Sequence, residues 1–142
     1  MIGGGSGITP LYQLLNHALA DPTNRTRFTL LYANVTETDI LLREELSALE
    51  RAHPQTLRVV HTLDKPPQGW AGASGFVSRE LIKAHVAPAE LGEKVKVFVC
   101  GASLLTAFAF LPRCVLTNRC FVSLREQALR GRSRPSREKS KG

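Results

Sequence analysis

The chain has 142 residues, of which 43% are hydrophobic, and this length suits one domain with a single core. No apolar run reaches the ~18 residues that cross a bilayer. Residues 1–10 are glycine-rich and uncharged, which does not fit a secretory signal. The sequence alone therefore predicts a soluble chain.

The formal net charge of +7 is concentrated at one end of the chain. Residues 1–112 hold ten Lys or Arg and ten Asp or Glu, whereas residues 113–142 hold nine basic and two acidic residues. The basic segment is Arg- and Ser-rich without an apolar period. We predict a folded domain over 1–112 and a basic, disordered tail over 113–142, in preference to a nucleic-acid-binding arm.

The cysteines and histidines do not form a recognisable ligand pattern. Cys100, Cys114 and Cys120 are an odd number without a CxxC pair, which argues against a disulfide framework and against a zinc site. The four histidines are scattered, and their spacing does not match that of metal ligands. We expect no metal.

Helix and strand patterns alternate along the chain. Met1–Ile2 resembles the last step of a strand that runs into the glycine loop, and a strand of normal length would begin upstream. The first helix is predicted over 10–20, with Thr9 as its cap and Pro10 as its first residue. A second helix is predicted from the Thr36–Asp39 capping box to 52, and a third from Ser78 to 85. Strands are predicted over 28–33, 56–62 and 95–100, and a loop over 65–75.

This alternation, with strands that are apolar throughout, predicts an α/β fold: a parallel sheet with helices on both faces. Such sheets bind ligands at the carboxyl ends of their strands. The loops at that end are Gly3–Thr9, Asn34–Asp39, the loop around Trp70, and the segment from Gly101 onward.

The glycine-rich loop Gly3–Thr9 is the strongest candidate binding site. Glycines allow positive φ and close approach of a ligand, and the helix that follows offers free N–H groups to a phosphate. A tight strand-to-helix turn without ligand is the alternative, but the loop holds more small residues than a turn needs. Pro10 replaces the third glycine of the dinucleotide fingerprint, and a P-loop Lys is missing, so spacing alone leaves the ligand open.

Two further strand ends carry weaker signals. Asp39 can accept hydrogen bonds from a ribose diol and repel a 2′-phosphate, or it can simply stabilise a helix N-terminus. Both roles can coexist. Cys100 followed by Gly101 fits a small buried hydrophobe at a strand end, where the glycine permits close approach of a ring or backbone.

Four segments in order closely resemble the NAD-binding lobe of NADH-cytochrome b5 reductases, which belong to the ferredoxin–NADP⁺ reductase-like flavoenzymes. They read GGGSGITPLYQLL, LLYANVTETDILLREEL, HTLDKPPQGWAGASGFVSRELI and KVFVCG, and the match covers about residues 1–101. The form GITPLYQL most resembles the fungal mitochondrial branch.

The resemblance implies cofactors, a partner and residue roles. The cofactors are NADH and FAD, the FAD being held mainly by a domain that precedes this lobe, and the partner is cytochrome b5. Asp39 would favour NADH over NADPH, and the Ala33–Asn34 turn would lie near the adenosine. The residues implied near the flavin and the nicotinamide are Gly5, Ser6, Gly7, Ile8, Thr9, Pro10, Cys100 and Gly101.

The sequence departs from the family after Cys100–Gly101, where Ala102–Leu105 replaces a proline-rich turn, and the family's closing segment is unrecognisable. We expect a truncated lobe without the flavin domain or the membrane anchor, and without reductase activity on its own. The resemblance places the intact enzyme at the mitochondrial outer membrane, with the endoplasmic reticulum as alternative. A non-catalytic fragment, or an interaction protein that uses the basic tail, are the alternative functions.

Overall fold

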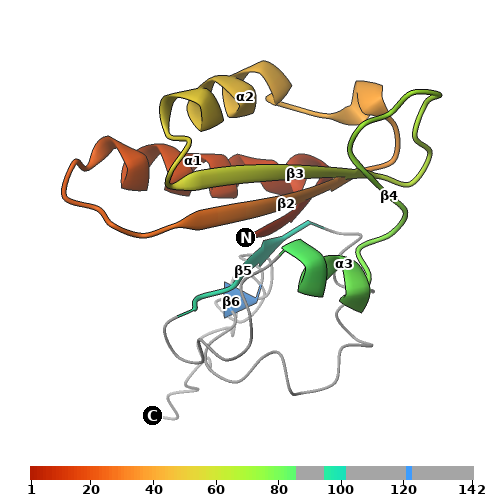
Figure 1. Ribbon diagram of the computed structural model, residues 1–142. Coiled ribbons are helices and arrows are strands. Elements are labelled where there is room, and N and C mark those ends of the chain that lie inside the picture. The colour runs from red at the N-terminus through yellow and green to blue at the C-terminus, as the bar shows by residue number, and fades with distance from the viewer. Residues whose placement is uncertain (86–94, 102–120, 123–142) are drawn as a thin grey trace, which may run out of the picture.

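The computed structural model describes residues 1–85, 95–101 and 121–122. Six parallel strands form one sheet in the order β4-β3-β2-β1-β5-β6. Helices α1 and α2 cover one face and α3 the other, which confirms the predicted fold class (Figure 1). The elements are β1 Ile2–Gly4, η1 Gly5–Gly7, α1 Ile8–Ala20, β2 Phe28–Asn34, η2 Glu37–Asp39, α2 Arg43–Ala52, β3 Leu57–Leu63, β4 Ala73–Ser74, α3 Arg79–His85, β5 Phe98–Cys100 and β6 Phe121–Val122.

Strand β1 lies in the middle of the sheet although it has only three residues. It pairs with β2 on one side and with β5 on the other. As expected from Met1–Ile2, the strand is short: it spans only Ile2–Gly4. Ladders on both sides provide the hydrogen bonds that a short strand could not secure alone.

The two faces of the sheet carry separate apolar clusters because side chains alternate along each strand. Leu30 and Tyr32 of β2 pack with Leu15 and Leu46 under α1 and α2. Leu31, between them in sequence, packs with Ile82 of α3 on the opposite face. The continuous apolar strands predicted from the sequence follow from this double burial.

Helix α1 begins two residues earlier than predicted. Gly7 is its N-cap and Ile8 its first residue, so Thr9 is not the cap. The turn η1 leads directly into the helix, and the Thr9 hydroxyl donates instead to the Ser6 carbonyl at 3.1 Å. Pro10 is still tolerated, because the first N–H groups of a helix have no intrahelical partner.

The Thr36–Asp39 capping box forms as predicted, but it closes only the 3-10 turn η2. Helix α2 starts later, at Arg43, because the chain leaves helical geometry at Ile40 and Leu42 adopts a left-handed conformation with φ of 55°. The predicted helix start is thus wrong by several residues. Ser78 does cap α3 as predicted, since its hydroxyl accepts from the Leu81 N–H at 3.2 Å.

Two short strands were not predicted. Ala73–Ser74 lies within the predicted loop and pairs with Thr62–Leu63, while Phe121–Val122 lies within the predicted tail and pairs with β5. Two residues are too few for a periodic signal. The remaining residues of 113–142, and the Ala102–Leu105 departure, lie outside the described residues, so the boundary after 112 stays a prediction.

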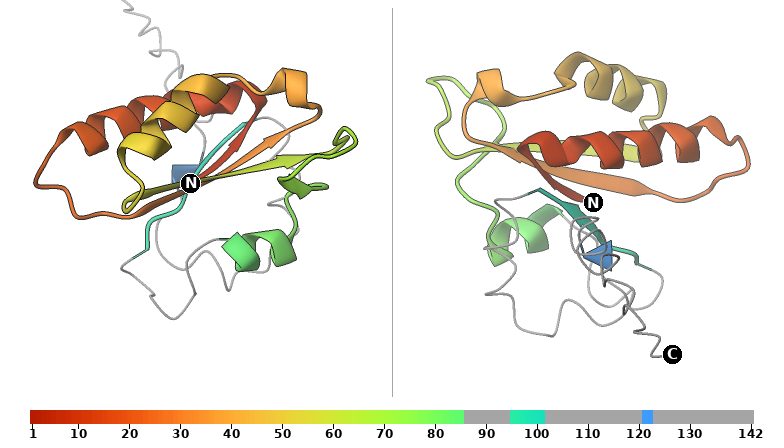
Figure 2. Two further views of the ribbon diagram at one scale, coloured as in Figure 1. Left: turned by 45° about the horizontal axis from the view of Figure 1, so that its top comes forward. Right: turned by 180° about the vertical axis from the view of Figure 1, so that it is seen from behind.

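All strands are parallel, so their carboxyl ends meet along one edge of the sheet. Figure 2 shows that the turn after β1 and the connections after β2 and β3 leave from this edge. Within the part of the chain that the structure describes, none of the helices has the length and apolarity to cross a bilayer.

Candidate functional site

A cavity of about 350 Å³ opens at the carboxyl edge of the sheet. Its walls come from the glycine loop, the end of β2, turn η2 and the segments that follow β3 and β4. The lining residues are Gly4, Gly5, Ser6, Ala33, Asn34, Val35, Thr38, Asp39, Leu41, Asp64, Phe76 and Val77. The structure therefore brings together two of the three sites predicted from the sequence.

The glycine loop has open space at Gly5 but is tightly packed against the Cys100–Gly101 backbone at Gly7. Gly5 has φ of +51°, and a Cβ built on it would meet nothing within 4 Å. A Cβ on Gly7 would overlap the Cys100 carbonyl and lie 2.6 Å from the Gly101 nitrogen. Gly101, at φ of +134°, packs in turn on the backbone of Gly4. Glycine is needed at Gly7 for close packing and at Gly5 for the positive φ.

The third predicted site, Cys100–Gly101, therefore lies against the glycine loop but does not line the cavity. Because β1 lies between β2 and β5, the loop separates this pair from the cavity. Among the described residues the Cys100 thiol forms no disulfide, and the residue is half-buried.

Gly7, which packs against Cys100 and Gly101, does not line the cavity. Three further residues predicted at the site also lie beside it. Ile8 is fully buried in the core cluster under α1, so its side chain supports the loop from below. Thr9 is exposed in the first helical turn, and Pro10 follows it, half-buried. Their contribution to ligand binding stays a prediction.

Asp39 makes a tight local contact. Its Oδ2 accepts hydrogen bonds from the Thr36 N–H at 2.8 Å and from the Thr36 hydroxyl at 2.7 Å. These bonds hold the pKa of the Asp39 carboxyl below its usual value. The local capping role is therefore real. The residue is exposed and lines the cavity, so the carboxylate is charged where a ribose could reach it.

Asn34 is the most unusual polar residue of the cavity. Its side chain is buried, at 6% exposure, and within the described residues neither amide atom meets full hydrogen-bond geometry with a partner. The amide still lies close enough to the Tyr32 hydroxyl to lower the pKa of that phenol. Buried polar groups are nearly always paired, and an unpaired one costs about 1–3 kcal/mol. An unpaired buried amide on a cavity wall is a candidate ligand contact.

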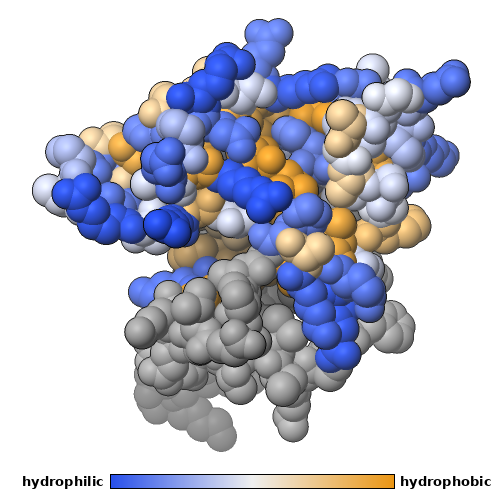
Figure 3. Space-filling view, in the orientation of Figure 1, coloured by the Kyte–Doolittle hydropathy of each residue, from blue (hydrophilic) through white to orange (hydrophobic). Residues whose placement is uncertain are grey.

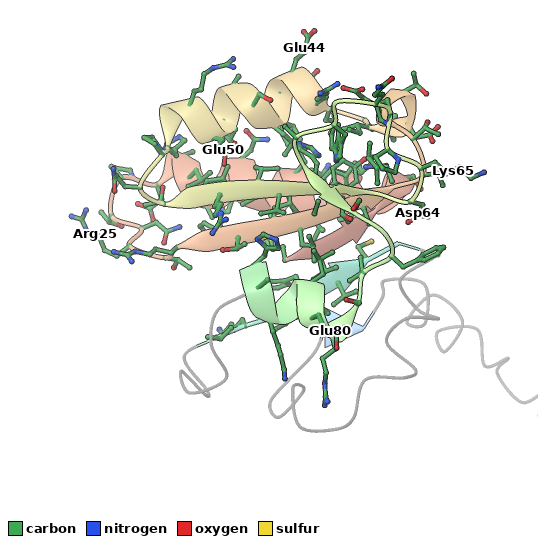
Figure 4. The ribbon with its side chains drawn as sticks, turned by 45° about the vertical axis from the view of Figure 1, so that its right-hand side comes forward. Arg25, Glu44, Glu50, Asp64, Lys65 and Glu80 are labelled. Carbon is green, nitrogen blue, oxygen red and sulfur yellow. The ribbon has the colours of Figure 1, made fainter. Side chains whose placement is uncertain are left out.

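Sequence reasoning missed Asp64, a second carboxylate at the cavity. It follows β3 directly, and Figure 4 shows it at the carboxyl end of the sheet, far from Arg25 at the opposite end. Partial burial raises the pKa of its carboxyl, an effect that Lys65 opposes. Its position after the second apolar strand was the available signal.

Tyr32 is the second residue that sequence reasoning missed. It is fully buried beneath the loops, and its hydroxyl donates to the Gly5 carbonyl at 3.0 Å and accepts from the Leu41 N–H at 3.3 Å. Burial raises the pKa of this hydroxyl, against smaller opposing effects of Leu41 and Asn34. The phenol is therefore neutral at physiological pH and can donate.

The cavity also holds exposed apolar side chains. Val35 and Leu41 are each 48% exposed and Phe76 is 78% exposed, and all three line the cavity. Elsewhere, as Figure 3 shows for one face, apolar residues lie mostly between hydrophilic ones. Clustered exposed apolar residues around a few polar groups are typical of a small-molecule site.

A second, larger cavity of about 620 Å³ lies along the outer edge of β3. Arg43 lines it, paired with Glu37 at 2.6 Å, and its guanidinium carbon lies over the Trp70 ring, 5.8 Å from the ring centroid. It includes none of the predicted site residues. Volume alone does not identify a site, and we assign the function to the smaller cavity because the chemically informative residues converge there.

The sequence profile of the oxidoreductase NAD-binding domain family matches residues 1–109. The chain belongs to this family. It is similar to NADH-cytochrome b5 reductase 2 of Homo sapiens, at 46% identity over 112 residues, which is 79% of this chain and 40% of that protein. It is also similar to NADH-cytochrome b5 reductase 2 of Botryotinia fuckeliana, at 50% identity over 101 residues, or 71% of this chain and 29% of that protein.

The fold is similar to solved structures of the same kind. The cytochrome b5 reductase domain of Ulva prolifera nitrate reductase has a TM-score of 0.67 and 36% identity, and the similarity covers 90% of this chain and 43% of that one. The CS-b5R domains of human Ncb5or, solved in an NAD⁺ form, have a TM-score of 0.64 and 28% identity, over 80% of this chain and 34% of that one. The chain thus spans well under half the length of the relatives it matches.

Proposed function

We propose that this chain is the NADH-binding lobe of a cytochrome b5 reductase. The observation that carries the proposal is the cavity in which the glycine loop meets the Asn34–Asp39 loop at the carboxyl edge of the sheet. This is the edge at which open parallel sheets bind nucleotides. The family likeness to NADH-cytochrome b5 reductases over 71–79% of the chain supports the same ligand.

The residues of the cavity fit a dinucleotide. The unpaired Asn34 amide offers a donor and an acceptor, Ser6 borders the helix that follows the glycine loop, and the exposed Phe76 and Leu41 offer apolar contact. We assign the adenosine end to this cavity. The nicotinamide end falls to the other side of the loop, toward Cys100–Gly101. When bound, NADH supplies a hydride from its nicotinamide ring.

The preference for NADH over NADPH rests on the carboxylates. Asp39 is charged and exposed at the cavity, and a charged carboxylate repels a 2′-phosphate. Asp64 lines the same cavity and adds negative charge above its raised pKa. We assign the main role to Asp39 and an additional role to Asp64.

Electron transfer would need parts beyond this lobe. By the family likeness, an FAD-holding domain would take the hydride from NADH and supply electrons singly to cytochrome b5, at the mitochondrial outer membrane or the endoplasmic reticulum. We expect no NADH-ferricyanide turnover from the 142-residue chain until a flavin domain is added. Turnover by the purified chain alone would overturn this part of the proposal.

Amide chemical-shift mapping with NADH tests the site itself. Signals of Gly5, Ser6 and Asn34 should shift on titration. The Trp70 indole N–H is an internal control, since it donates to the Ala73 carbonyl beside the second cavity, and it should not move. Shifts confined to Trp70 and its neighbours would place NADH in the second cavity and contradict the proposal.

A further inference from the structure

Tyr32 lies beneath both loops that form the cavity, and its hydroxyl connects them. It bonds the Gly5 carbonyl at 3.0 Å and the Leu41 N–H at 3.3 Å, and both of these residues line the cavity. The phenol ring is fully buried in the core cluster that also holds Leu15 and Leu46. One hydroxyl, fixed by the core, therefore sets the positions of two backbone segments that are far apart in sequence.

The bond to Gly5 fixes the direction of a binding group. A trans peptide is planar, so the Gly5 carbonyl and the Ser6 N–H point in opposite directions. With the carbonyl directed at buried Tyr32, the Ser6 N–H points away from the core. Gly5 also has a positive φ, at +51°. Without the hydrogen bond its backbone would be free to adopt other conformations, because glycine populates positive and negative φ about equally.

The bond to Leu41 acts at the second loop. Leu41 stands between the capping box that contains Asp39 and Leu42, whose φ of 55° is positive although it is not a glycine. Such a conformation persists only where the surroundings impose it. The Tyr32 hydroxyl and the start of α2, where the Leu46 N–H donates to the Leu42 carbonyl at 2.9 Å, hold the chain on both sides of it.

We propose that Tyr32 is a positioning residue, whose hydroxyl pre-organises the glycine loop and the Asp39 loop for the dinucleotide. This inference rests on the proposed NADH function. Loss of the hydroxyl leaves the ring in the core but releases both loops, so ligand binding must order them again and affinity falls. Because the Asp39 loop is released too, the preference for NADH over NADPH falls with it.

The test is Tyr32→Phe in the full chain, with Tyr12→Phe on α1 as matched control. The Tyr12 side chain packs on the same core cluster, and within the described residues its hydroxyl makes no hydrogen bond to the cavity loops. We expect NADH to bind Tyr32→Phe about fivefold more weakly, the loss typical of one buried hydrogen bond. The ratio of NADPH to NADH dissociation constants should fall, whereas Tyr12→Phe should match the wild type in both.

A purely structural role would lower stability and leave the cofactor ratio unchanged, and that result would overturn the inference. Amide hydrogen exchange at Leu41 gives a second readout that does not need NADH: it should speed up in Tyr32→Phe and not in Tyr12→Phe. If wild-type chain fails to bind NADH, the proposed function is wrong, and exchange at Leu41 still decides whether Tyr32 holds the loop. Unchanged exchange at Leu41 would overturn the inference in either case.

Discussion

On its β5 side the glycine loop packs backbone against backbone, and on its β2 side it borders a cavity. Gly7 and Gly101 close the first side so tightly that neither accepts a Cβ without displacing main chain. The second side is built by side chains from several elements, and it includes an unpaired buried amide and a charged carboxylate. Rigidity and ligand chemistry are thus divided between the two sides of one loop.

The largest effect that this comparison predicts is on the closed side. Gly7→Ala should lower the free energy of unfolding by about 3 kcal/mol, because its Cβ overlaps the Cys100–Gly101 backbone, which cannot rotate away as a side chain can. Gly5→Ala should cost only about 1 kcal/mol, the strain of a left-handed alanine with open space around it. Urea unfolding measures both. Equal losses of unfolding free energy in the two variants would mean that the two sides of the glycine loop are packed alike.

Buried polar groups give the next effect. The Thr62 hydroxyl donates to the Gly75 carbonyl at 2.8 Å, so Thr62→Val should destabilise the chain by about 1 kcal/mol. Within the described residues the Asn34 amide meets full hydrogen-bond geometry with no partner, so Asn34→Leu should leave stability level or raise it by up to ~1 kcal/mol while NADH affinity drops. If Asn34→Leu destabilises as Thr62→Val does and NADH binding is unchanged, Asn34 has a structural role and no ligand role.

The smallest effect concerns the pH dependence of stability, through His61, which lines the second cavity. Burial lowers the pKa of His61, whose ring lies 5.8 Å from that of Tyr32. The unfolded chain takes up this proton near pH 6.5 and the folded chain only at lower pH, so unfolding becomes easier as pH falls below 6.5. His61→Phe should reduce the difference in unfolding free energy between pH 7.5 and pH 5.5. An unchanged difference would show that His61 does not contribute to it.

The closed side of the glycine loop could be predicted from the sequence. Glycines and Cys100–Gly101 mark the closed side directly, because close backbone approach requires particular residue types. The alternation of elements was enough to predict the parallel sheet and the edge where the loops gather. The start of α2 was missed because Leu42, a residue without turn preference, adopts the left-handed conformation there.

The open side was harder to predict because its residues depend on tertiary contacts. Tyr32 carries no local signal, because it is an aromatic residue within an apolar strand. The only signal for Asp64 was its position directly after a strand. Their roles follow from the hydrogen bonds to Gly5 and Leu41 and from the shared cavity. The short strands β4 and β6 were missed because two residues hold no period.

Isothermal titration of the purified chain with NADH, and with NADPH as comparison, tests the central claim most directly. We expect saturable binding of NADH that is clearly tighter than that of NADPH, with the preference reduced in Asp39→Ala and reduced to a lesser degree in Asp64→Ala. Absence of binding to either nucleotide, from chain shown by circular dichroism to be folded, would contradict the assignment of this cavity to NADH.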